Sequence, residues 1–67
     1  MHIKLNNEVI MLPDEDITIS DLLKMRNIDE NGIAVAINGR LAKRPGWSNT
    51  LLKENDDIVF ISAAFGG

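Results

Sequence analysis

One segment near the end of the chain restricts the fold more than any other: Ile58-Val59-Phe60-Ile61, where four successive residues are apolar. The side chains of a strand alternate between the two faces of its sheet, and a strand that is apolar on both faces is typical of the centre of a sheet. The segment is therefore predicted to be a central strand. The alternation assigns Ile58 and Phe60 to the core under a helix, and Val59 and Ile61 to the opposite face.

Four further strands are predicted upstream, and they group into two hairpins. Apolar and polar residues alternate in the first strand, Asn6-Asn7-Glu8 is a turn signal, and the apolar run that follows ends at Pro13. Asn38-Gly39 joins the second pair, because Asn-Gly is the preferred sequence of a two-residue hairpin turn. The predicted strands cover residues 2–6, 9–12, 33–37 and 40–43.

A single main helix is predicted over residues 18–27. Thr18 is a suitable N-cap, and Asp21 stands three positions later, as in a capping box. Apolar residues then recur at helical spacing on one face, at Ile19, Leu22 and Leu23. The segment after the second hairpin is irregular, with one helical turn expected near residues 48–52. Trp47 is assigned to the core, because its ring buries a large apolar area.

The order of these elements predicts the fold class. Two hairpins flank one helix, and the most apolar strand comes last, so that strand is expected to lie centrally and pair in parallel with the first. This is the α+β arrangement called β-grasp, as in ubiquitin-like domains: a mixed sheet of four to five strands with one main helix on one face. We expect a single domain over residues 1–67, with a flexible tail at 64–67.

Composition excludes several classes of function. The 67 residues include no cysteine, which excludes a disulfide framework and a thiolate nucleophile. The one histidine, His2, makes a poor metal site without cysteine partners. The formal net charge of −3 argues against nucleic acid as a partner. The sequence has neither a membrane-spanning run nor a signal-peptide pattern, so we expect a cytoplasmic protein. A chain this short encloses no deep active site, so we expect it not to be an enzyme itself.

The sequence ends in two glycines, Gly66 and Gly67, just after the predicted central strand. Because glycine has no Cβ, such a tail fits a narrow channel in another protein, and its backbone can pair with a sheet edge there. A carboxylate becomes a good electrophile once it is converted to a mixed anhydride such as an acyl-adenylate. We therefore interpret the Gly67 carboxylate as the reactive group, which the folded body presents to partner enzymes.

Three stretches carry a resemblance to a known family: TISDLL at residues 18–23, AINGRLAKRPGW at 36–47, and the terminal Gly-Gly. On these stretches the chain resembles the ThiS family, the sulfur carrier proteins of thiamine biosynthesis, over nearly its whole length. The carriers of molybdenum-cofactor synthesis and ubiquitin are related and share the Gly-Gly end. Two positions depart from the family pattern, since Lys43 stands where proline is frequent and Phe65 where a small residue is usual.

The resemblance implies a mechanism in which the chain binds no cofactor of its own. A ThiF-type adenylyltransferase, similar to ubiquitin-activating enzymes, would use ATP and Mg²⁺ to adenylate the Gly67 carboxylate. A cysteine desulfurase or a rhodanese-type donor would then supply sulfur and leave a thiocarboxylate. A ThiG-type thiazole synthase would take that sulfur for the thiazole ring of thiamine.

Partner contacts are expected in three places. The tail residues Ala64, Phe65 and Gly66 would enter the partner, Val59 and Ile61 would form an apolar docking patch, and a basic cluster would steer docking to an acidic rim. This cluster consists of Arg40, Lys43 and Arg44.

Three other functions remain open at this point. The chain is alternatively the sulfur-carrier subunit of molybdopterin synthase, a ubiquitin-like protein modifier, or an interaction domain whose tail has no function.

Overall fold

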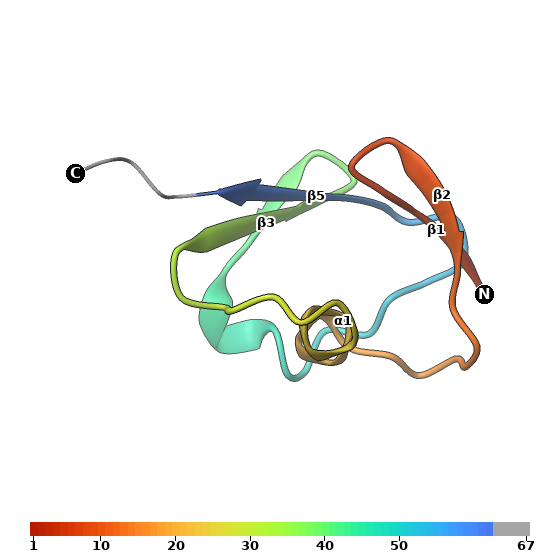
Figure 1. Cartoon of the computed structure of the whole chain (residues 1–67), viewed down its shortest axis with the longest axis horizontal. Coiled ribbons are helices and arrows are strands. Elements are labelled where there is room, and N and C mark those ends of the chain that lie inside the picture. Colours follow the sequence, from red (N-terminus) through yellow and green to blue (C-terminus); the bar gives the residue numbers. More distant parts are fainter. Residues whose placement is uncertain (63–67) are drawn as a thin grey trace.

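A computed structural model describes residues 1–62 of the chain. Its strands form one five-stranded sheet in the order β2-β1-β5-β3-β4, and one α-helix packs against a single face of that sheet (Figure 1). The predicted β-grasp architecture is therefore confirmed. The elements are β1 (His2–Leu5), β2 (Glu8–Met11), α1 (Ile19–Met25), β3 (Ile33–Ile37), β4 (Arg40–Ala42), the 3₁₀ turn η1 (Arg44–Gly46) and β5 (Asp57–Ser62).

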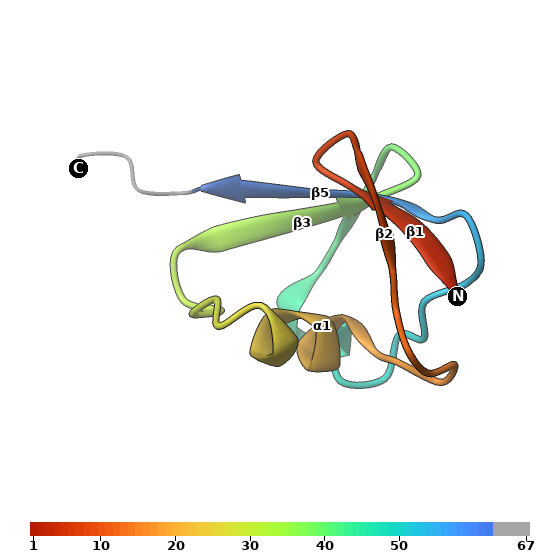
Figure 2. The same ribbon diagram turned by 45° about the vertical axis from the view of Figure 1, so that its right-hand side comes forward.

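The last strand, β5, lies at the centre of the sheet as its apolar sequence predicts. It pairs in parallel with β1, where Leu5 faces Ile58, and antiparallel with β3 along five residue pairs from Ile33↔Ser62 to Ile37↔Ile58. Figure 2 shows β5 alongside β3, with α1 below the sheet on one of its faces. The strand thus connects the two hairpins, which are otherwise separate in the sheet.

Helix α1 begins where the sequence predicts, with a complete capping box. The Asp21 backbone N–H donates to the Thr18 hydroxyl at 3.1 Å, and the Thr18 backbone N–H donates to the Asp21 carboxylate at 3.1 Å. The backbone hydrogen bond from Thr18, and then the bond with its side chain, lowers the pKa of Asp21. The helix ends at Met25, shortly before the predicted end, because Asn27 adopts a left-handed φ of 56°.

One apolar core lies between α1 and the sheet. Trp47 is 2% exposed, and its indole N–H donates to the Ala42 carbonyl at 2.8 Å, which confirms its assignment to the core. Ile58 is fully buried, and Phe60 is partly buried against the same cluster. The buried apolar residues are Ile3, Leu5, Leu12, Ile17, Ile19, Leu22, Leu23, Val35, Trp47, Leu52 and Ile58.

The prediction of a helical turn near residues 48–52 is wrong. The turn instead spans Arg44–Gly46, where Pro45 supplies the φ angle suited to the start of a helical turn. Residues 50–52 are extended, because their backbone pairs with the chain that enters α1: the Ile19 N–H donates to the Thr50 carbonyl at 3.1 Å, and the Leu52 N–H donates to the Ile17 carbonyl at 2.8 Å. The backbone pairing of residues 50–52 with the chain that enters α1 therefore determines their conformation, rather than their local preference for a helical turn.

Candidate functional site

The candidate site is the C-terminal part of β5 with the sheet face around it. The predicted reactive residue Gly67 and the predicted tail contacts Ala64, Phe65 and Gly66 lie outside the described residues. The structure describes β5 as far as Ser62, which is the end of the strand from which the chain continues to Gly67.

Val59 and Ile61 point away from the core, as the alternation predicts. Val59 is 37% exposed and Ile61 is 49% exposed, on the sheet face opposite α1. The sheet register adds three neighbours to them, because Val59 pairs with Ala36, Ala36 pairs with Leu41, and Ile61 pairs with Ala34. We call this set the outer patch: Ala34, Ala36, Leu41, Val59 and Ile61.

Sequence reasoning missed Leu41 and the two alanines of the outer patch. Leu41 is 67% exposed on the edge strand β4. The Asn38-Gly39 turn fixes the register of β3 and β4, so counting outward from that turn would have placed Leu41 opposite Ala36. Leu41, Val59 and Ile61 are exposed, and the partly exposed alanines of β3 lie between them, so the patch extends over three strands. Contiguous exposed apolar surface of this kind is typical of a protein–protein contact.

The basic cluster is exposed, but its three members differ in their contacts. The Arg44 guanidinium donates to the side-chain carbonyl of Asn31 and lies 3.9 Å from the Glu30 carboxylate. Within residues 1–62, Arg40 and Lys43 have no such ion pair. Arg40 directly precedes Leu41 in β4, so its side chain lies on the opposite face of the sheet from the outer patch, whereas the charge of Arg44 is partly balanced by Glu30 in the loop before β3.

Two asparagines from hairpin turns hold β5 in place. Asn38, in the turn between β3 and β4, accepts from the Asp57 N–H through its side-chain oxygen at 2.9 Å and donates from its side-chain nitrogen to Asp56 at 2.9 Å. Asn6, in the turn between β1 and β2, accepts from the Phe60 N–H at 2.9 Å. Both asparagines have positive φ, 50° at Asn6 and 51° at Asn38. We call them the hairpin asparagines.

Asp56 is the one buried charged residue among those described, at 8% exposed. Its second carboxylate oxygen accepts from the Lys53 N–H at 2.7 Å, so both oxygens have partners. Asp56 therefore connects the β3–β4 turn to the loop that leads into β5. Sequence reasoning missed this connection, although the sequence shows Asn38 at a turn position that favours a positive φ.

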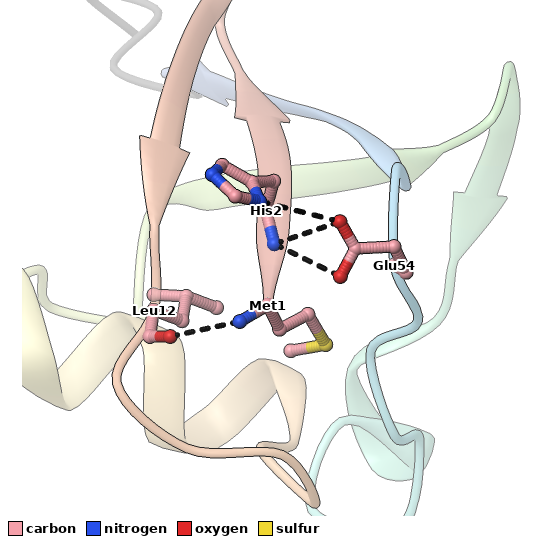
Figure 3. A network of polar contacts seen from close by, with 4 residues as sticks. All are labelled: Met1, His2, Leu12 and Glu54. Atoms are coloured by element: carbon pink, nitrogen blue, oxygen red, sulfur yellow. Dashed lines mark hydrogen bonds and ion pairs between the residues drawn. The ribbon is translucent and has the colours of Figure 1, made fainter.

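The remaining polar groups near the N-terminus anchor the first strand (Figure 3). The His2 backbone N–H donates to both carboxylate oxygens of Glu54 at 3.1 Å, its ring Nδ1 lies 3.4 Å from Glu54, and the Met1 amino group donates to the Leu12 carbonyl at 3.1 Å. A pocket of about 380 Å³ lies beside them, lined by Met1, Leu51 and Leu52 and by four charged residues. These contacts fasten the strand and bring together no catalytic set.

No group of histidine, cysteine and carboxylate side chains in residues 1–62 is arranged to hold a metal ion. The helices in that range are also too short or too polar to cross a bilayer.

Comparison with known proteins agrees with this geometry. A search of curated protein sequences gave no match. A solved structure of a thiamine biosynthesis protein (ThiS) from Geobacter metallireducens superposes with a TM-score of 0.87 at 22% identity, and the match covers 100% of both chains. The model of the ThiS family matches residues 3–67, which takes in the sheet, the outer patch and the terminal Gly-Gly. The chain belongs to the ThiS family.

Proposed function

We propose that this chain is a sulfur carrier in thiamine biosynthesis, with the Gly67 carboxylate as the carrying group. The observation that supports this most is the family match, which extends through Gly66-Gly67. The fold shared with a thiamine biosynthesis protein (ThiS) supports the same function. The chain would work in the cytoplasm as a protein substrate of other enzymes rather than as an enzyme.

The proposed chemistry takes place on one carbon atom. A ThiF-type adenylyltransferase transfers AMP from Mg²⁺-bound ATP to the Gly67 carboxylate and releases pyrophosphate. A sulfur nucleophile, supplied by a cysteine desulfurase or a rhodanese-type protein, then attacks the carbonyl carbon and displaces AMP. If the nucleophile is a cysteine persulfide of the donor, this attack gives an acyl disulfide. A second thiol then attacks the donor's sulfur and forms a disulfide with it, which breaks the S–S bond and leaves a thiocarboxylate at the end of the chain. A ThiG-type thiazole synthase draws its sulfur from this thiocarboxylate.

The outer patch is the proposed docking surface for these partners. β5 carries Val59 and Ile61 and ends at Ser62, so a partner that covers the patch also lies next to the residue from which the chain continues to Gly67. Arg40 and Lys43 are exposed and unpaired within residues 1–62, so an acidic rim on the partner would complement them. Arg44 would contribute less to this attraction, because Glu30 and Asn31 already hold its guanidinium.

The decisive experiment is an intact-mass measurement. The chain is incubated with an adenylyltransferase of this family, MgATP and a sulfur source, and we expect an adenylate followed by replacement of one oxygen by sulfur at the C-terminus. A chain that lacks Gly67 is the control and should stay unchanged. If the full chain gains neither AMP nor sulfur, the proposal fails.

Two alternative functions are distinguished by separate outcomes. Rescue of a molybdenum-cofactor defect, without rescue of thiamine auxotrophy, would assign the chain to molybdopterin synthase. Conjugates of higher mass that disappear when Gly67 is removed would assign it to protein modification.

A further inference from the structure

The chain contains two Asn-Gly pairs, Asn31-Gly32 and Asn38-Gly39. An Asn-Gly pair is prone to deamidation, because the glycine has no side chain to hinder its backbone nitrogen from attacking the asparagine side-chain carbon. Both glycines are equally open, since a Cβ built on either would meet no atom within 4 Å. The glycines therefore do not distinguish the two pairs, whereas the two asparagine side chains are held differently.

The Asn38 side chain is held by partners that cannot move away without disturbing the fold. Its nitrogen donates to the buried carboxylate of Asp56, and its oxygen accepts from the backbone N–H of Asp57 in β5, both at 2.9 Å. For the Gly39 nitrogen to reach the side-chain carbon, the amide has to rotate out of both bonds. That rotation leaves a buried carboxylate oxygen without its partner, which is costly.

The Asn31 side chain has only exposed side chains as partners. Its nitrogen donates to the Asp29 carboxylate at 3.1 Å, and its oxygen accepts from the Arg44 guanidinium. Asn31, Asp29 and Arg44 are all exposed. Water replaces such partners at little cost, so the Asn31 amide is free to turn toward Gly32.

We infer that Asn31 is a site of spontaneous deamidation in the folded protein and that Asn38 is protected. The Gly32 nitrogen forms a bond to the side-chain carbon of Asn31, and the bond from that carbon to the amide nitrogen breaks. Ammonia leaves with the proton that the Gly32 nitrogen loses, and a five-membered succinimide remains. Water then opens the ring at either carbonyl, which gives an aspartate or an isoaspartate linkage.

The new carboxylate would lie beside Arg44 and close to Glu30, in the loop before β3. It would balance the positive charge of Arg44 more fully, so Arg44 would no longer add to the net positive charge of the basic cluster. This consequence for docking rests on the proposed function, whereas the modification itself does not. An Asn31→Asp variant reproduces the charge, and an Asn31→Gln variant keeps the neutral amide.

Peptide mapping by mass spectrometry tests the inference. The folded full-length chain is aged at mildly alkaline pH, and the conversion of each Asn-Gly pair is followed over time. We expect Asn31 to react at least about tenfold faster than Asn38, since the loss of two hydrogen bonds corresponds to more than that factor. In concentrated urea the two rates should become similar, because both asparagines then precede an unhindered glycine.

Two results would overturn the inference: equal rates in the folded protein, or a faster rate at Asn38. Ageing the Asn31→Gln variant shows which residue gives the fast deamidation. This variant should lose the fast phase, which we assign to Asn31, and keep the slow phase, which we assign to Asn38. For the docking consequence, Asn31→Asp should weaken the salt dependence of binding to the adenylyltransferase relative to Asn31→Gln. If binding is unchanged while Asn31 still deamidates, only the proposed docking role of the cluster fails.

Discussion

Replacing Asn38 by alanine should destabilise the domain far more than its position in an exposed turn suggests. The substitution removes two hydrogen bonds, one of them to the buried Asp56 carboxylate and one to the backbone of β5. Net losses of this kind amount to about 2 kcal/mol in total. The φ of 51° at Asn38 adds about 1 kcal/mol, because alanine tolerates the left-handed region poorly. The expected loss of unfolding free energy is therefore about 3 kcal/mol.

Urea unfolding followed by Trp47 fluorescence measures this loss, since the indole is buried in the native state. Asn38→Gly separates the two contributions, because glycine loses the same hydrogen bonds but accepts the positive φ, so it should cost about 2 kcal/mol. Asn31→Ala is the matched control at the other Asn-Gly pair. Its partners are exposed side chains, so it should cost less than about 1 kcal/mol. If Asn38→Ala and Asn31→Ala cost the same, Asn38 does not anchor β5.

Three further predictions test the capping box, the outer patch and the tail. Thr18→Ala should destabilise the fold by about 1 kcal/mol through loss of the N-cap. Because the folded-state pKa of Asp21 is lowered, its stabilisation is present above the ordinary aspartate pKa and is lost as the pH falls through the lowered value. Thr18→Ala should weaken this acid limb only in part in urea titrations at several pH values, because the backbone N–H of residue 18 still donates to Asp21. Ile61→Asp should leave the midpoint of urea unfolding nearly unchanged but weaken binding to the adenylyltransferase, measured by calorimetry. Ile58→Ala, at a buried position, should lower the free energy of unfolding by about 2–5 kcal/mol. A stability loss at Ile61 as large as that at Ile58 would contradict the assignment of the two side chains to opposite faces of the sheet. Removal of Gly67 should abolish sulfur loading and barely shift the melting temperature, and a large shift would show that the tail supports the fold.

The sequence alone predicts those features that depend on neighbouring residues. The capping box of α1 needs only Thr18 and Asp21, three positions apart, and the Asn38-Gly39 turn needs only two adjacent residues. The central place of β5 follows from apolar residues on both of its faces. The reactive end, Gly67, was inferred in the same way and remains a prediction from sequence and family.

The tertiary structure decides what depends on segments far apart in the chain. It moves the helical turn to residues 44–46, because the backbone of residues 50–52 pairs with the entrance to α1. It brings Leu41 next to Val59 across β3, and it places Asn38 against Asp56. No local pattern encodes these contacts, since their energy is gained only when the sheet has closed and its register is set.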